Sequence, residues 1–492
     1  MAVRRAGRRL RSTLLPTLLL IACSRNPATG RLQFALPSDA EEIELGRSAD
    51  AEVHASMPSY DEQPAVTALV AEVGARLSEH SERAGLPWRY TVLDEPAVNA
   101  FALPGGFVYV TRGLLAHLES TDELAAVLAH ETGHVTARHG VVQLRKQATA
   151  RRSVGIFRVI DPNLQHIGGF AARTAGLALL AYSREDEHEA DDLAIRYVDA
   201  AGFRRDALVR VFAVLTALAQ RGGDQTPQWL STHPDPAERQ QRTAAAIHID
   251  PAVPPTPEPA YLQTIAGLAF GEDPRDGYLL ENLFVHPRGG FELELPAGWK
   301  VLHDREQVLA VSPDEHALFM TMPTKHRDRE AALGDFFRDS SMTGGQRIEG
   351  RVGGLPFTSQ SFAMVGDDGV KLMGLVAFVD HSGRVMAMVA IGPEQDWGAR
   401  ADLLARSFAS FSPIREPARA AVGPARVEVV ALPRAMTLDD AARELGGITS
   451  ADGLALLNGV QAGVALPSGY LLKQVRAPGP TQGPVNTKPT TP

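Results

Sequence analysis

The chain has 492 residues, about three times the length of a typical domain, so we expect several domains. With 44% hydrophobic and 22% charged residues, its composition is that of a folded protein and excludes a mainly disordered chain. Residues 1–22 hold five arginines and no acidic residue; the remainder has 44 basic and 58 acidic residues, a net charge of −14. So acidic a chain is a poor partner for nucleic acid, and we expect no nucleic-acid partner. A single cysteine excludes an internal disulfide.

Residues 1–22 are typical of an export signal. A basic start precedes a short apolar run, residues 14–22, which is too short to span a bilayer. Residues 20–23, Leu-Ile-Ala-Cys, resemble the bacterial lipobox, in which the cysteine is lipidated. We therefore expect a signal peptide over 1–22 and a lipidated tether over 23–37, with Cys23 as the lipidation site. Because Ser24 follows, the resemblance implies the periplasm, with the chain anchored to the outer membrane; the alternative is an uncleaved apolar start with an incidental cysteine.

Two proline-rich stretches predict where domains meet. The pattern before the first stretch alternates helix and strand, and the pattern after it is richer in strands. The predicted parts are a mixed domain over 38–250, a linker over 251–262, an α+β domain of unknown role over 263–414, a linker over 415–425, a strand-helix-helix-strand module over 426–475 and a disordered tail over 476–492. The predicted fold class is therefore α+β.

Within the first domain, polar–apolar periodicity predicts helices over 38–56 and 62–84 and a strand over 88–93. Residues 99–102 and 107–111 flank the turn Pro-Gly-Gly and predict a β-hairpin. This hairpin directly precedes the segment that carries the chemistry.

A metal-binding motif, HExxH, spans residues 130–134. Ser120 predicts the start of its helix and Gly140 the end, and the apolar run before the motif predicts that the helix is buried. His130 and His134 are four residues apart, so both imidazoles project from one face and can bind one cation. Two buried histidines and Glu131 would be unfavourable without such a partner.

A third ligand is expected from a later helix. The spacing typical of a metzincin is absent, since Ala137 and Gly140 stand where that class has glycine and histidine. A helix starting at Ser183 presents Glu187 and Asp191 on one stripe. We predict Glu187 as the third ligand and Asp191 as the acceptor of a ring N–H, that of His130; the alternative is an exposed acidic helix start.

The order HETGH, SREDEHEAD, THPDPAER resembles the zinc metallopeptidases that include the CaaX prenyl proteases, the HtpX-like proteases and the periplasmic beta-barrel assembly-enhancing protease. The resemblance covers about residues 40–245. It implies a mainly helical, gluzincin-like (zincin-like) catalytic domain with a small β-hairpin or sheet, one Zn²⁺ per chain and endopeptidase activity. It maps Glu187 onto a ligand and Asp191 onto a supporting acid. Unlike the CaaX enzymes, this chain lacks multiple membrane spans, and unlike the barrel-assembly protease it shows no tetratricopeptide repeats.

The resemblance also implies roles in catalysis. A zinc with three protein ligands keeps a position for water, and Glu131 would take the proton of that water. His233 and Arg239 are candidate donors to the oxyanion; His233 could instead occupy the open zinc position, or belong to a plain proline-rich turn. An exposed edge strand, formed by Asn99, Ala100, Phe101 and Ala102, is expected to pair with the substrate backbone.

Residues 426–475 weakly resemble a LysM module, which would imply peptidoglycan binding; a small protein-docking domain is the alternative. We expect a lipid-anchored periplasmic zinc endopeptidase that acts on misfolded or stalled envelope proteins. Two rivals are open: a chaperone-like assembly factor of the outer membrane with weak or silenced protease activity, and a peptidoglycan-remodelling zinc enzyme.

Overall fold

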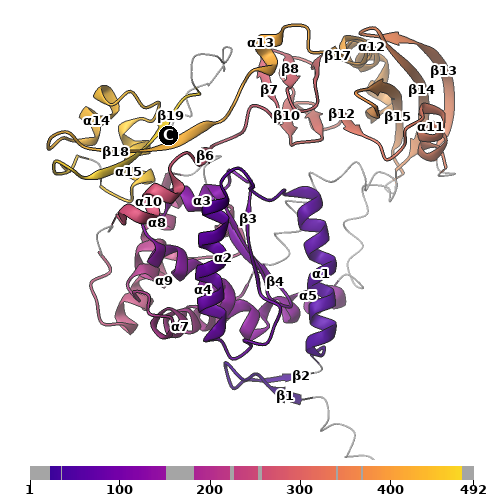
Figure 1. Ribbon diagram of the computed structural model, residues 1–492. Coiled ribbons are helices and arrows are strands. Elements are labelled where there is room, and N and C mark those ends of the chain that lie inside the picture. Colours follow the sequence, from indigo (N-terminus) through magenta and orange to yellow (C-terminus); the bar gives the residue numbers. More distant parts are fainter. Residues whose placement is uncertain are drawn as a thin grey trace, which may run out of the picture.

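The computed structural model describes residues 23–34, 36–150, 182–221, 227–252, 257–338, 342–366, 369–461 and 463–478. The expected signal peptide and residues 479–492 of the expected tail lie outside these ranges. The elements form three groups, seen in Figure 1 as an indigo-to-magenta body, an orange sheet module and a yellow C-terminal module. This mixture of helices and sheets confirms the α+β class. Among the described residues, no helix combines the length and apolarity needed to cross a membrane.

The first group is mainly helical. Its helices are α1 (Asp39–Ser56), α2 (Pro64–Glu79), α3 (Arg112–His117), α4 (Thr121–Ala137), α5 (His139–Ala150), α7 (Arg184–Ala200), α8 (Ala207–Arg221), α9 (Pro236–Ala246) and α10 (Pro259–Ile265), with a 3₁₀ turn η2 (Gln228–Ser231). Helix α1 begins where the sequence predicts, because Ser38 and Glu41 form a capping box. Helix α2 ends at Glu79, several residues earlier than predicted.

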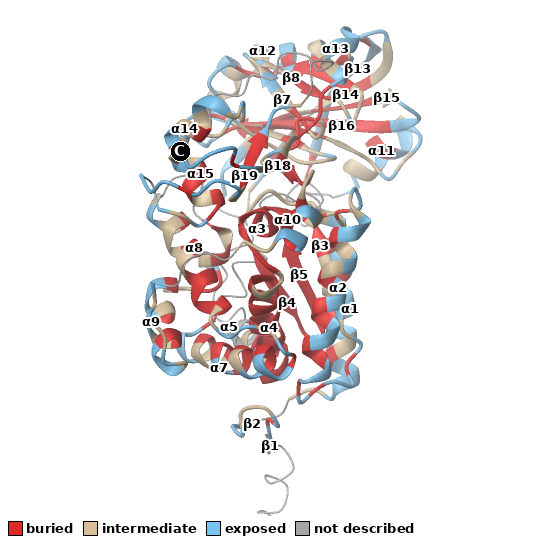
Figure 2. Ribbon diagram, turned by 60° about the vertical axis from the view of Figure 1, so that its left-hand side comes forward, coloured by how far each residue is buried: buried red, intermediate tan, exposed pale blue. Residues whose placement is uncertain are grey.

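A small sheet lies beside these helices. Strands β3 (Arg89–Leu93), β5 (Phe107–Thr111) and β4 (Ala100–Leu103) follow in that order, with β3 parallel and β4 antiparallel to β5. Gly105 has φ 83° and Gly106 has φ 101°, the left-handed conformation that glycine supplies most easily. Helix α4 packs against β4, α2, α7 and α8, and Figure 2 shows it buried along its length. The predicted metal helix is therefore the centre of this group.

The residues expected to form a polar tether instead begin with a hairpin. Strand β1 (Cys23–Arg25) pairs antiparallel with β2 (Leu32–Phe34). Asn26 in the turn is only 2% exposed and donates a side-chain hydrogen bond to the carbonyl of Thr136 in α4, 3.1 Å away. A polar segment can dock in this way when the last carbonyls of a helix need donors.

The second group is the sheet module. One sheet has the order β10-β11-β12-β16-β15-β14-β13, and a smaller one has the order β17-β9-β8-β7. Helix α12 packs against β9, β15 and β16, and α11 packs against β15. The elements are β7 (Tyr278–Leu280), β8 (Leu283–His286), β9 (Phe291–Glu294), β10 (Lys300–His303), β11 (Val308–Val311), β12 (Leu318–Pro323), α11 (Arg329–Phe336), β13 (Thr343–Val352), β14 (Leu355–Val365), β15 (Lys371–His381), β16 (Arg384–Pro393), α12 (Glu394–Ser410), β17 (Ser412–Pro413) and α13 (Pro417–Ala420).

The third group has the predicted order of strand, helix, helix, strand: β18 (Ala425–Ala431), α14 (Leu438–Glu444), α15 (Ala451–Leu457) and β19 (Leu471–Arg476). A short strand that precedes the sheet module in sequence, β6 (Ala269–Phe270), pairs with β18. Val427, Leu457 and Val475 belong to the same hydrophobic core as the apolar residues of α2 and α4. The module is therefore docked on the first group; its LysM-like character and the exact domain boundaries stay predictions.

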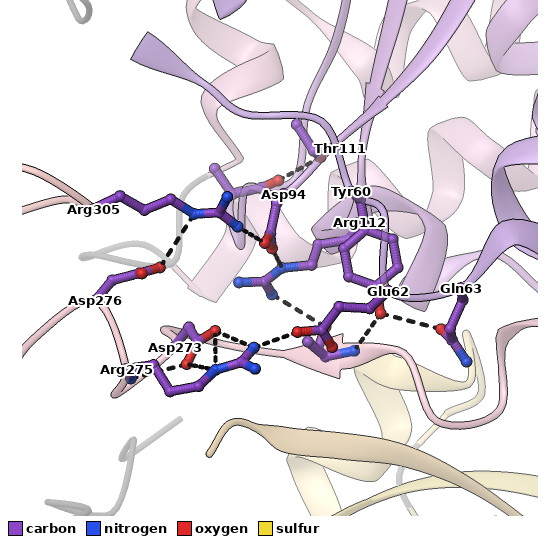
Figure 3. A network of polar contacts seen from close by, with 12 residues as sticks. Tyr60, Glu62, Gln63, Asp94, Thr111, Arg112, Asp273, Arg275, Asp276 and Arg305 are labelled. Atoms are coloured by element: carbon purple, nitrogen blue, oxygen red, sulfur yellow. Dashed lines mark hydrogen bonds and ion pairs between the residues drawn. The ribbon is translucent and has the colours of Figure 1, made fainter. Parts of the chain in front are cut away.

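Ion pairs also join the sheet module to the first group (Figure 3). Arg112, which follows β5, pairs with Asp94 at 2.6 Å between Nε and Oδ1. Arg305, from the loop after β10, pairs with the other oxygen of Asp94. Arg275 pairs with Glu62 close by. The ends of β3 and β5 are thus the point at which the modules meet.

Candidate metal centre

Helix α4 presents two imidazoles to one point inside the domain. The helix starts because the side chain of Ser120 accepts a hydrogen bond from the backbone N–H of Glu123. His130 and His134 lie one turn apart, both are buried, and their Nε2 atoms are 3.0 Å from each other. The sequence-predicted pair is therefore brought together.

Helix α7 brings a carboxylate to the same point. Ser183 and Asp186 form its capping box, which fixes where the helix begins. The Oε1 of Glu187 is 3.4 Å from Nε2 of His134, and its Oε2 is 3.5 Å from Nε2 of His130. The two helices approach closely at Gly133, where a Cβ would lie 3.0 Å from the carbonyl oxygen of Ala190.

His233 supplies a fourth donor. It follows η2, and its ring stacks on Trp229 with centroids 4.6 Å apart. Its Nδ1 is 2.9 Å from Oε1 of Glu187 and 3.4 Å from Nε2 of His130. One donor atom each from His130, His134, Glu187 and His233 all lie within 4.8 Å of one another. The sequence left open whether His233 donates to the oxyanion, occupies the open zinc position or belongs to a plain turn. In the structure its ring lies inside the donor cluster.

These donors fit a zinc ion. Three imidazole nitrogens and one carboxylate oxygen form a donor set that zinc binds in proteins. Burial holds the pKa of His134 well below its usual value, so its ring is neutral and offers a lone pair. Two buried ring nitrogens facing each other at 3.0 Å are favourable only with a shared proton or a cation between them.

Glu187 is suited to bind a cation because it is ionised. Burial alone would raise the pKa of its carboxyl, but the neighbouring His233 and Arg239 outweigh that effect and hold the pKa well below the usual value. A metal-binding carboxylate must be deprotonated.

Glu131 lies beside the donor cluster. Its Oε1 is 3.6 Å from Nε2 of His233, and neither of its buried carboxylate oxygens has a hydrogen-bond partner among the described residues. Burial raises its pKa, an effect that His233 and His130 partly oppose. A carboxylate with free lone pairs and a raised pKa has the properties of a general base.

Asp191 lies behind His130, where the sequence placed it. Its Oδ1 is 3.0 Å from Nδ1 of His130, the ring nitrogen that faces away from the donor cluster. Such a carboxylate fixes the tautomer and the orientation of a metal-binding imidazole.

Arg239 lies against the donor cluster, and its role as an oxyanion donor stays a prediction. Its guanidinium pairs with Oε2 of Glu187 at 2.5 Å and with Oδ1 of Asp191 at 2.6 Å, and its Nη2 lies 3.3 Å from Nε2 of His130. Its Cζ also lies 4.5 Å from the ring centroid of Phe212 and 4.9 Å from that of Trp229. Because α9 packs against α7, Arg239 holds the acids that support the centre.

Two neighbours of the centre were missed by the sequence analysis. Tyr182 stacks on His134 with centroids 3.9 Å apart, and His139 has its Nδ1 3.0 Å from Nδ1 of His134. The predicted helix end at Gly140 is wrong: α4 ends at Ala137, and Arg138 turns the chain with φ 62°. That turn brings His139 back toward the site, and no periodicity in the sequence signals it.

Strand β4 lies beside the centre but is not exposed. It is an edge of its sheet, as predicted, but Asn99, Ala100, Phe101 and Ala102 are all at most 3% exposed. The expected exposure is wrong because α4 packs on the strand and the Phe101 ring stacks on that of Tyr109. The start of the strand is also contacted by η2, whose Trp229 donates a backbone hydrogen bond to Val98. A small pocket lined by Ala102, Leu103, Pro104 and His134 joins the strand to the metal-binding residues.

Residues 64–246 match the model of peptidase family M48. The chain is 34% identical over 170 residues to mitochondrial metalloendopeptidase OMA1 of Arabidopsis thaliana, covering 34% of this chain and 33% of that protein. It is 32% identical over 188 residues to a putative beta-barrel assembly-enhancing protease of Vibrio cholerae, covering 36% and 38%. It is 27% identical over 221 residues to beta-barrel assembly-enhancing protease of Escherichia coli K12, covering 43% and 45%. The chain thus spans less than half the length of each of these relatives.

Residues 64–246 are therefore an M48 metallopeptidase domain, and M48 metallopeptidases are zinc-dependent. The described cluster of three histidines and one glutamate can hold that ion.

Proposed function

We propose that this M48 domain makes the chain a zinc-dependent endopeptidase of the bacterial periplasm that hydrolyses misfolded or stalled envelope proteins. The observation that carries the proposal is the convergence of His130, His134 and Glu187 on one buried point beside Glu131, whose carboxylate oxygens accept no hydrogen bond from the described residues. The substrate class is supported by the similarity to barrel-assembly proteases.

We assign the chemistry to the residues of this site. Zinc, when bound by His130, His134 and Glu187, would polarise the scissile carbonyl and acidify a water molecule. Glu131 accepts the proton of that water and passes it to the leaving amine. Asp191 keeps the His130 ring in place, and Arg239 keeps Glu187 ionised.

His233 defines a closed resting arrangement in this proposal. Its Nδ1 lies among the donors, where water or substrate would have to bind. The same segment touches the edge strand, since Asn99 donates to Oε1 of Gln228 at 3.4 Å. Movement of η2 and His233 would free both the fourth zinc position and the start of β4 at Val98 and Asn99, where substrate would then pair.

The location is proposed from the N-terminal sequence. Lipidation of Cys23 would anchor the chain to the outer membrane, since each buried lipid CH₂ contributes about 0.8 kcal/mol. Outer-membrane assembly machinery is a candidate partner, because two relatives carry barrel assembly in their names. Peptidoglycan is a candidate partner of residues 426–475.

The test compares Glu131→Gln with the wild type in zinc content and in digestion of casein. We expect one zinc per chain in both proteins and a loss of cleavage of at least about a hundredfold in the variant, because the base is gone. Glu72→Gln, on the exposed face of α2, is the matched control and should digest normally. Equal digestion by Glu131→Gln and wild type would show that Glu131 is not the base.

The same experiment separates the chaperone-like alternative. A wild type that binds zinc, cleaves no unfolded protein and still suppresses aggregation of casein would favour an assembly factor over a protease. Release of muropeptides from purified peptidoglycan would favour a wall-remodelling enzyme.

A further inference from the structure

We propose that the N-terminal hairpin, residues 23–34, is part of the support of the metal centre and fixes the ring of His134 through a chain of hydrogen bonds. The inference rests on the metal-dependent function proposed above. It assigns positioning roles to His139, Glu189, Arg31 and Asn26, none of which takes part in the proposed proton transfers.

The chain of hydrogen bonds starts at Nδ1 of His134, the ring nitrogen that faces away from the other metal-binding donors. This atom is 3.0 Å from Nδ1 of His139, and Nε2 of His139 is 2.9 Å from Oε2 of Glu189. With a cation on Nε2 of His134, the ring proton is on Nδ1, so His134 donates to His139 and His139 donates to Glu189. A carboxylate thus ends the chain, as Asp191 does directly for His130.

The hairpin reaches this chain at its far end. The Nε of Arg31 lies 3.3 Å from Oε1 of Glu189, so one carboxylate is shared between the hairpin and His139. In a second contact, the side chain of Arg196 in α7 donates a hydrogen bond to the carbonyl of Ala28 at 3.4 Å. The hairpin is therefore attached to the helix that also carries Glu187.

The hairpin also completes the end of the metal helix. The last carbonyls of a helix lack partners within it. The Nδ2 of Asn26 donates to one of them, that of Thr136, while its Oδ1 accepts from the backbone N–H groups of Ala28 and Thr29 at 2.8 and 3.2 Å. One buried side chain therefore closes the hairpin turn and holds the final turn of α4, just after His134.

His139 is a positioning residue in this arrangement. It is 5% exposed and lies behind His134, outside the group of four donors. Its effect on a bound ion passes through the orientation and basicity of the His134 ring. Loss of such a partner weakens metal binding about ten- to a hundredfold in comparable sites.

The test uses the full chain with Co²⁺ as the probe, because its visible absorption reports ligand geometry independently of activity. We measure the Co²⁺ dissociation constant and spectrum for His139→Phe, Glu189→Gln, Arg31→Met and Asn26→Leu. We expect affinity about ten- to a hundredfold weaker for His139→Phe, a smaller loss for the other three, and a changed spectrum in each.

Matched controls lie close to the variants. Arg25→Met alters an exposed arginine of the same hairpin, and Glu185→Gln alters an exposed glutamate of α7; both should match the wild type. Arg31 is an exposed side chain, so its variant is expected to fold even if Asn26→Leu does not.

Each outcome decides a part of the proposal. If His139→Phe kept the Co²⁺ affinity and spectrum of the wild type, the proposed chain of hydrogen bonds would be wrong. A weakened His139→Phe with unchanged Arg31→Met and Glu189→Gln would confine the effect to His139 and overturn the role of the hairpin. A wild type that binds no Co²⁺ or Zn²⁺ would instead overturn the proposed function itself.

Discussion

His117 is a buried histidine outside the metal centre, and it makes stability depend on pH. Its Nδ1 donates to the carbonyl of Gly113 at 2.8 Å within α3, and burial lowers its pKa to about 4. The unfolded chain has a histidine pKa of about 6.5, so between pH 6.5 and 4 the unfolded state binds more protons. The contribution of His117 to the free energy of unfolding is therefore fully present above pH 6.5 and is lost as the pH falls from 6.5 to about 4.

The prediction compares wild type with His117→Gln, which retains a donor but does not titrate. Between pH 7 and pH 5 the wild type should lose about 2 kcal/mol more of its free energy of unfolding than the variant. Urea unfolding at both pH values measures this. Other buried histidines such as His286 are common to both proteins, so equal pH dependence would show that His117 is not the cause.

His233 offers a second test at the scale of one side chain. Because its Nδ1 lies among the donors, removing the ring should free a position that water or substrate needs. We expect His233→Ala to cleave casein several-fold faster than wild type while keeping its zinc, since three donors are left. A fall in kcat with unchanged zinc content would favour the other role, a donor to the oxyanion.

Among the helices, the approach of α4 and α7 decides whether the three ligands meet. Gly133 allows it, because a Cβ at this position would already lie 3.0 Å from the carbonyl oxygen of Ala190. Gly133→Val should push the helices apart, destabilise the protein by about 1–3 kcal/mol and weaken zinc binding at least tenfold. Gly398→Val in α12 meets no atom within 4 Å at its Cβ and controls for the poorer helix propensity of valine. Equal zinc affinity in both variants would contradict the prediction.

Elements with complete local signals were predictable from the sequence. The capping residues of α1 and α7 are adjacent in sequence to the helices they start. The hairpin β13–β14 carries no such local signal, because β13 is exposed along nearly its whole length and is rich in glycine and charge. It forms because β14 supplies its partner, which is tertiary information. For the same reason the chain turn at Arg138, and with it the place of His139, could not be predicted.

On the scale of the whole molecule, one lysine links the C-terminal module to the peptidase domain. Lys473 of β19 is fully buried; its Nζ pairs with Glu119 at 2.8 Å and donates to the carbonyls of Ala116 and Leu118. Sequence patterns place lysines at the surface, so this docking was not foreseen. These contacts of Lys473 lie just before the start of α4, whereas Asn26 contacts the other end of the same helix.

Lys473→Met should lower the free energy of unfolding by about 1–3 kcal/mol, because the buried carbonyls of Ala116 and Leu118 lose their donor and Glu119, whose pKa burial raises to about 8, loses its partner. Lys473→Met combined with Glu119→Gln should recover part of that loss, since no ionisable carboxyl is then left buried without the ammonium. Lys300→Met, at an exposed position of β10, is the control. Denaturant unfolding measures all three; a Lys473→Met protein as stable as the control would show that the pair does not secure the module.

The docked hairpin has a consequence for where the enzyme can work. Cys23, the proposed acylation site, is also the first residue of β1, so no slack chain separates an acyl group from the folded body. If Cys23 is acylated as proposed, the folded protein would be confined to the immediate neighbourhood of the lipid surface. The hairpin and the nearby metal centre would then lie on the side of the molecule that faces the leaflet, and the proposed substrates would be polypeptides that reach this surface.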